Sequence, residues 1–178
     1  HDPVEDVDFV EEEMDLWLAG IVDRNWESIE RQSRSPDFAL DESLEDMLAG
    51  VGASELDVAR TLRELDYPDD PIAWTDADRE ALAREIRERT KPIVVVANKA
   101  DIAPEGNVER LREAAERVVP CTAEGELALR QAVEAGVVDY DPGDEDFEIT
   151  GDLSDAQAEG LERIRGVMSE FGGTGLQD

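Results

Sequence analysis

The sequence predicts an α/β fold in which a parallel sheet follows a mostly helical region. Two observations carry this prediction. Apolar residues recur at helical spacing over about the first 90 residues. The run 92–97 is then continuously apolar and β-branched, which is typical of a parallel strand buried on both faces. We therefore expect two domains, a helical one over 1–90 and an α/β one over 91–178.

The helical region begins with one long helix, predicted over 4–33. Val10, Trp17 and Trp26 lie in its apolar stripe and are expected in the core. Shorter helices are expected over 41–49, 54–66 and 76–89. Thr75 is the expected N-cap of the last of these. Arginines of that helix follow glutamates at i,i+4 spacing, so the two can pair on one helix. This favours a self-paired, solvated face over a face that binds a partner.

The α/β region is predicted to alternate strands and helices. After the strand 92–97, the expected elements are a helix over 107–117, a strand over 118–121, a helix over 125–135 and a last helix over 154–171. Ser154 is the expected cap of the last helix. The acidic stretch 139–152 is predicted to be a solvated loop. Its glycine and glutamate do not have the spacing of an EF-hand calcium loop.

The charge balance is extreme. The chain has 47 Asp and Glu against 17 Lys and Arg, a net charge of −30, yet 40% of its residues are hydrophobic. This combination favours a folded domain with an acidic surface over a disordered tail. Only Lys91 and Lys99 are lysines. Because salt screens such self-repulsion, we infer a halophilic source. The alternative is a mesophilic acidic protein with basic partners.

Several classes of protein and site are excluded. No apolar run approaches the roughly 20 residues that span a bilayer, and no secretory signal opens the sequence. Cys121 is the sole cysteine and His1 the sole histidine, so a disulfide, a zinc site and a His-dependent triad are not expected. We assign no catalytic and no metal-ligating residue, expect no membrane partner, and expect a cytoplasmic location.

The motif that carries chemistry is Asn98-Lys99-Ala100-Asp101, directly after the predicted buried strand. It is the NKxD pattern with which GTP-binding proteins read guanine. The Asp101 carboxylate can accept from the ring N–H and the amino group of guanine, whereas adenine presents an acceptor there. The Lys99 stem can cover the base, and Asn98 would tie the loop to its neighbours. The alternative is an ordinary polar turn between strand and helix.

A second element follows the next strand. Thr122-Ala123 stands where GTP-binding proteins carry a Ser/Thr-Ala pair whose backbone N–H binds the guanine oxygen. Thr122 could equally be a simple helix cap. Cys121 is predicted to be a small buried residue rather than a redox group.

Three blocks of the chain resemble the Obg-related YchF (Obg-like ATPase) family, in its archaeal GTP-type branch. They are His1–Val7 with Glu13–Leu18, Lys91–Asp101, and Pro120–Leu129. The resemblance implies part of a P-loop NTPase domain, the parallel-sheet GTPase fold, carrying a helical insertion. Members that prefer ATP depart from NKxD, so Asp101 implies guanine.

The resemblance also implies what this stretch lacks. In the family a phosphate-binding loop comes first and a TGS domain last, and neither GxxxxGK[ST] nor a metal-holding DxxG occurs here. We therefore expect an internal fragment of a GTPase that uses GTP and Mg²⁺, with its metal ligands elsewhere, and expect this fragment alone to be inactive. The alternative is that 1–90 docks a partner without binding nucleotide. Ribosome and RNA links are implied by the resemblance alone.

Overall fold

A computed structural model describes residues 2–65 and 67–177. Contacts divide the chain into two compact units, one of residues 8–93 and one of residues 1–7 with 94–178. Each unit is described by itself. The division into domains at residue 90 stays a prediction. Within the described residues, no helix is both long and apolar enough to cross a membrane.

The unit 8–93 is helical, and the predicted helices are present. Its elements are α1 (Pro3–Gln32, whose first residues belong to the other unit), α2 (Leu40–Leu48), the 3-10 turn η1 (Ala49–Val51), α3 (Glu55–Glu64), the 3-10 turn η2 (Pro71–Ala73) and α4 (Asp76–Thr90). The predicted cap at Thr75 is confirmed: its side chain accepts from the Asp78 N–H, and the Asp78 carboxylate accepts from the Thr75 N–H.

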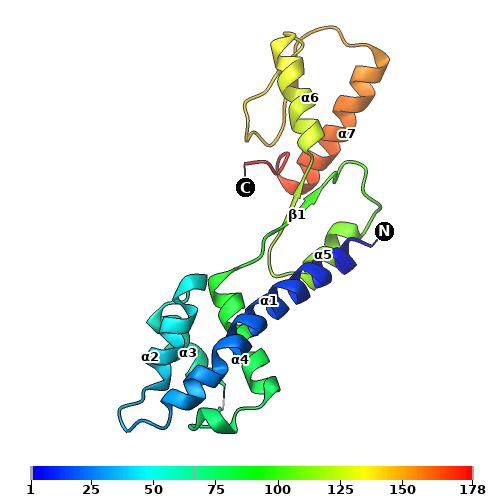
Figure 1. The fold of residues 1–178 in the computed structure, drawn as a ribbon. Helices are drawn as coiled ribbons and strands as arrows, with labels where there is room; N and C mark the ends of the chain where they lie inside the picture. Colours follow the sequence, from blue (N-terminus) through cyan, green and yellow to red (C-terminus); the bar gives the residue numbers. More distant parts are fainter. Residues whose placement is uncertain (1, 66, 178) are drawn as a thin grey trace. The chain divides into compact units, whose positions relative to one another are not determined.

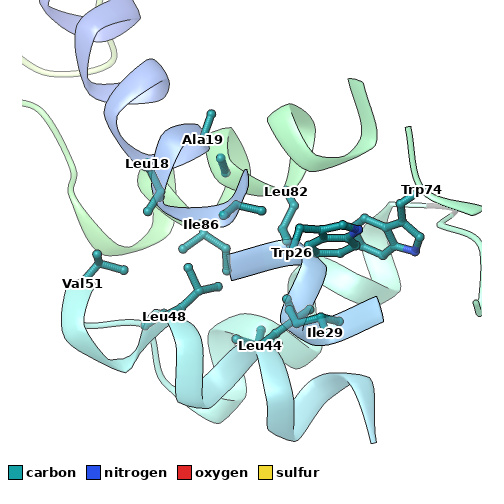
Figure 2. Close-up of a cluster of buried hydrophobic side chains, with 14 residues drawn as sticks. Leu18, Ala19, Trp26, Ile29, Leu44, Leu48, Val51, Trp74, Leu82 and Ile86 are labelled. Carbon is teal, nitrogen blue, oxygen red and sulfur yellow. The ribbon is translucent and has the colours of Figure 1, made fainter. Parts of the chain in front are cut away.

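The core of this unit forms where α1, α2 and α4 meet (Figure 2). Leu18, Leu44 and Leu82 are fully buried in it. Trp26 lies with its ring centroid 4.9 Å from that of Trp74, and its indole N–H donates to the Pro71 carbonyl at 3.3 Å. The buried indole therefore keeps a hydrogen-bond partner within the core.

The expected burial of Val10 and Trp17 is wrong. Both side chains are 49% exposed. The buried face of α1 runs through Leu18, Ala19, Val22, Trp26 and Ile29. Apolar residues occupy more than half of the helix circumference here, so the sequence stripe is wider than the face that packs.

The arginines of α4 pair with acidic residues of α1 and α3 as well as with acidic residues of α4 itself. Arg79 bonds to Asp23 and Asp76, and both Arg84 and Arg87 bond to Asp15 of α1. Arg89 bonds to Glu64 of α3 as well as to Glu85 of its own helix. The expected self-paired, solvated face is confirmed only for the Glu85–Arg89 pair. Arg87 is buried, and four pairs join α4 to α1 or α3, so the rest of that expectation is wrong.

The α/β unit holds the remaining elements. They are β1 (Val95–Asn98), α5 (Asn107–Ala114), β2 (Val118–Cys121), α6 (Ala123–Glu134), β3 (Val138–Asp139), β4 (Glu148–Ile149) and α7 (Asp155–Phe171). β1 pairs with β2 in parallel, and α5 connects them. Helices α6 and α7 lie side by side (Figure 1) and enclose a second core around Leu129, Ile164 and Met168.

Strand β1 departs from its prediction. It begins three residues later, at Val95, and its burial alternates instead of being complete: Val94 is 45% and Val96 is 60% exposed. Among the described residues β1 pairs with β2 alone, so its outer edge has no neighbouring strand. The stretch 139–152, expected to be a loop, contains all of β4 and the second residue of β3. These two short strands pair with each other antiparallel.

Candidate functional site

The two predicted motifs meet at one edge of the parallel sheet. In the β1–β2 register, Asn98 stands opposite Cys121, so the residues after both strands leave the sheet at the same end. The backbone joins them directly, because the Ala100 N–H donates to the Cys121 carbonyl at 3.0 Å. Residues 99–101 and 122–123 therefore lie next to one another at this edge of the sheet.

Asn98 links the two loops through a single oxygen. Its Oδ1 accepts from the Lys99 N–H at 2.8 Å and from the Ala123 N–H at 3.2 Å. The Cys121 thiol lies 3.7 Å from the same oxygen. The backbone N–H of Ala123, which the sequence assigns to a ligand oxygen, thus bonds to Asn98 in this structure.

Asp101 is held by Thr122. The Thr122 hydroxyl donates to Oδ1 of Asp101 at 2.8 Å. Thr122 is fully buried and also caps α6, since its Oγ1 accepts from the Gly125 N–H at 3.1 Å. The interpretation of Thr122 as a helix cap is therefore confirmed, and its part in binding a base stays a prediction. An ionised carboxylate has about four lone-pair positions, so Asp101 keeps acceptor capacity beyond the Thr122 bond.

Lys99 has an unusual backbone. Its φ is 66°, the one positive φ at a non-glycine position within the described residues. For a residue with a Cβ, this left-handed conformation costs about 1–2 kcal/mol. Such strain collects at binding loops, where the surroundings hold it in place. Lys99 is exposed.

A hollow of about 410 Å³ lies next to this loop. Asn98, Lys99 and Ala100 line one part of it, and apolar residues of β1 and α5 line another. Within the described residues, Asp101 and Thr122 do not line this hollow. The predicted site residues thus come together on the loops rather than inside one enclosed cavity.

The remaining candidates have structural roles. Cys121 is 3% exposed, and burial raises the pKa of its thiol, so it is a neutral buried group at pH 7. In the acidic loop, the Asp144 carboxylate accepts from the Asp141 N–H. The residues that the structure describes contain no group of three or more His, Cys, Asp or Glu arranged to hold a metal ion.

The sequence reasoning missed a buried carboxylate near the site. Glu126 of α6 is 2% exposed and bonds to Tyr140 and Thr174. A signal was available: Glu126 stands three residues before the buried Leu129, on the apolar face of its helix. A charged residue at such a position predicts a buried network rather than a solvated side chain.

The chain is similar to several proteins that are described as GTP-binding. Residues 96–178 match the family described as Obg-like GTPase YGR210-like, G4 motif-containing domain. An uncharacterized GTP-binding protein of Methanocaldococcus jannaschii is 34% identical over 183 residues, covering 100% of this chain and 45% of that protein. An uncharacterized GTP-binding protein of Schizosaccharomyces pombe is 24% identical over 160 residues, covering 88% of this chain and 39% of that protein.

A solved structure has the same fold. The crystal structure of a GTP-binding protein from Pyrococcus horikoshii OT3 matches with a TM-score of 0.75 and 36% identity, covering 99% of this chain and 48% of that one. The predicted α/β class with a parallel sheet is thereby confirmed. The chain spans about half the length of the relatives that it matches.

Proposed function

We propose that the loops after β1 and β2 bind the guanine base of a nucleotide. The observation that carries this proposal is the Asp101 carboxylate, which the buried Thr122 hydroxyl holds at 2.8 Å beside the Ala123 N–H. One acceptor and one donor, fixed on neighbouring loops, complement the N–H groups and the carbonyl oxygen along one edge of guanine. The match of residues 96–178 to a G4 motif-containing domain supports the same assignment.

Each residue has a distinct role in this proposal. Asp101 accepts from the ring N–H and the amino group of guanine. The alkyl stem of Lys99 covers one face of the base and keeps its ammonium in water. The Ala123 N–H donates to the guanine oxygen. In the structure it donates to Asn98 over a comparatively long 3.2 Å, so the base competes with Asn98 for this donor.

We further propose that the longer protein to which these residues correspond is a GTPase, since the relatives are named GTP-binding proteins and are about twice as long. Phosphoryl transfer needs a phosphate cradle and Mg²⁺. The described residues contain no group of three or more His, Cys, Asp or Glu arranged to hold a metal ion, and we assign no step of hydrolysis to them. Their part in the reaction is to select the base.

The proposal is tested by titrating the chain with GDP, inosine diphosphate and ADP while NMR follows its backbone amides. Because the base alone is held, we expect millimolar affinity for GDP, about −4 kcal/mol. Shifts should gather at 98–101 and 122–123. Inosine diphosphate, which lacks the amino group, should bind more weakly, and ADP should leave these amides unchanged. Equal responses to GDP and ADP would contradict the proposal.

A further inference from the structure

A buried carboxylate stands behind the proposed base site. Both oxygens of Glu126 are fully engaged: Oε2 accepts from the Tyr140 hydroxyl at 2.7 Å and from the Thr174 hydroxyl at 2.6 Å. Oε1 accepts from Arg130 at 2.7 Å and from the Gln177 amide at 3.2 Å. Burying a charge is costly unless it is bonded in this way. The four donors fix Glu126 against three separate segments: its own helix, the residues after β3, and the turn after α7.

The turn after α7 is the next link. Thr174 is 1% exposed, and while its hydroxyl bonds to Glu126, its carbonyl accepts from the Thr122 N–H at 2.9 Å. The turn lies directly on the end of β2. A Cβ on Gly175 would stand 2.0 Å from the Pro120 carbonyl oxygen, and the φ of Gly175 is +77°. Only glycine permits this approach, which places Thr174 against Thr122.

These contacts form a continuous path to the site. Glu126 holds Thr174, the Thr174 carbonyl holds the Thr122 backbone, and the Thr122 hydroxyl holds Asp101. We infer that Glu126 is a positioning residue that, through Thr174, sets the Thr122 side chain and so aims the Asp101 carboxylate. The effect on guanine selection rests on the proposed function. The positioning of Asp101 can be tested without it.

If Glu126 had a purely structural role, its loss would change the stability of the fold without acting selectively on the loops that hold Asp101. A buried ionic group can often be replaced by apolar residues without loss of stability, so stability alone is weak evidence for its purpose. Glu126 differs from a purely structural carboxylate because its hydrogen bonds connect it, through Thr174 and Thr122, to Asp101. Removing the Thr174 hydroxyl leaves the Thr174 carbonyl and the charge of the chain unchanged. It breaks the bond to Glu126 and the longer 3.4 Å contact with Oε1 of Gln177.

The test compares Thr174→Val, which removes the hydroxyl, with Thr174→Ser, which keeps it. The measurement is the hydrogen-exchange rate of the amides of Ala100, Thr122, Ala123 and Gly125, whose bonds lie along the path. The reference amides are Ala135 and Ala158, bonded within helices away from it. We expect exchange at the path amides to rise about tenfold relative to the references in Thr174→Val, and to recover in Thr174→Ser.

Glu126→Gln is the second variant and Glu134→Gln its control, since both remove one charge from α6 and Glu134 is exposed. The amide of Gln can still accept from Arg130, but it loses the charge-assisted bond to Thr174, so a smaller rise in exchange at the same amides is expected. A uniform change at path and reference amides, or no change in Thr174→Val, would overturn the inference.

A nucleotide measurement separates the inference from the proposed function. Preference for GDP over inosine diphosphate should fall in Thr174→Val and return in Thr174→Ser. If the parent prefers guanine and Thr174→Val alters neither its preference nor the path amides, the positioning role is wrong. If the path amides respond but the parent shows no guanine preference, the positioning of Asp101 stands and the proposed function fails.

Discussion

The Thr122 hydroxyl donates to the Asp101 carboxylate at 2.8 Å across two parallel strands. The same hydroxyl oxygen accepts from the Gly125 N–H and caps α6. One buried threonine therefore ties the start of a helix to the side chain proposed to read the base. Its two roles cannot be separated by removing the hydroxyl, so the residue to change is its partner Asp101.

The first prediction concerns the base. Asp101→Asn should weaken binding of GDP by about 10- to 100-fold, since a hydrogen bond to a charged group is worth about 1.5–3 kcal/mol. It should favour xanthosine diphosphate, whose carbonyl replaces the guanine amino group and can accept from the new amide. Competition binding measures both effects. Asp152→Asn, an exposed acid of the same unit, is the control and should change neither.

Local chemistry made the helix starts predictable. The caps at Thr75 and Ser154 depend on residues a few positions away, and both are present in the structure. The two motifs were expected to bind one base at the ends of parallel strands, and the structure brings them together, but the bond from Thr122 to Asp101 was not predicted. By contrast, the path through Thr174 depends on how the turn after α7 folds back onto β2, and no local pattern encodes that return.

The burial of individual side chains was harder to predict than whether a segment forms a helix or a strand. The β-branched run predicted that Val96 would be covered on both sides, whereas it is 60% exposed. Periodicity reports which residues favour burial, but the number of neighbouring strands decides how far they attain it. Trp17 is exposed for a different reason: the apolar stripe of α1 is wider than the face of the helix that packs.

The second prediction concerns strain at Lys99. Lys99→Gly and Lys99→Ala both remove the long side chain, but only alanine keeps a Cβ at a φ of 66°. We expect Lys99→Gly to be more stable than Lys99→Ala by about 1 kcal/mol in urea unfolding. Equal stability of the two variants would show that the left-handed conformation carries no strain.

The third prediction concerns the close approach of Gly175. Gly175→Ala places a Cβ 2.0 Å from the Pro120 oxygen, so backbone must shift. The control is Gly136→Ala, which has a similar φ of +72° and nothing within 4 Å of its Cβ. Gly175→Ala should lower the unfolding free energy by about 1–3 kcal/mol more than Gly136→Ala does. Similar costs would mean that the turn does not press on β2.

The fourth prediction concerns pH. Burial acts to raise the pKa of Glu126, but hydrogen bonds from Thr174, Tyr140 and Arg130 outweigh it and hold the pKa below its ordinary 4.5. A lowered folded-state pKa stabilises the fold above 4.5, and this contribution is lost as the pH falls through the lowered value.

Glu126→Gln removes that titration and keeps the other acidic groups. The parent should therefore exceed the variant in unfolding free energy most at neutral pH, and the difference should shrink below pH 4.5. Urea unfolding at several pH values gives the difference directly. A gap that stays constant down to about pH 2 would show that the Glu126 pKa is not lowered by folding.

The last prediction concerns salt. With a net charge of −30, the folded chain repels itself, and KCl screens this repulsion over a Debye length that falls to about 3 Å at 1 M. The melting temperature should therefore rise between about 0.1 M and 3 M KCl. Glu12 and Glu13 are adjacent, exposed acids of α1. Replacing both, as Glu12→Lys with Glu13→Lys, should raise the melting temperature in dilute buffer and have little effect in concentrated KCl. A melting temperature that is flat or falls with salt, in parent and variant alike, would show that charge repulsion does not limit this fold.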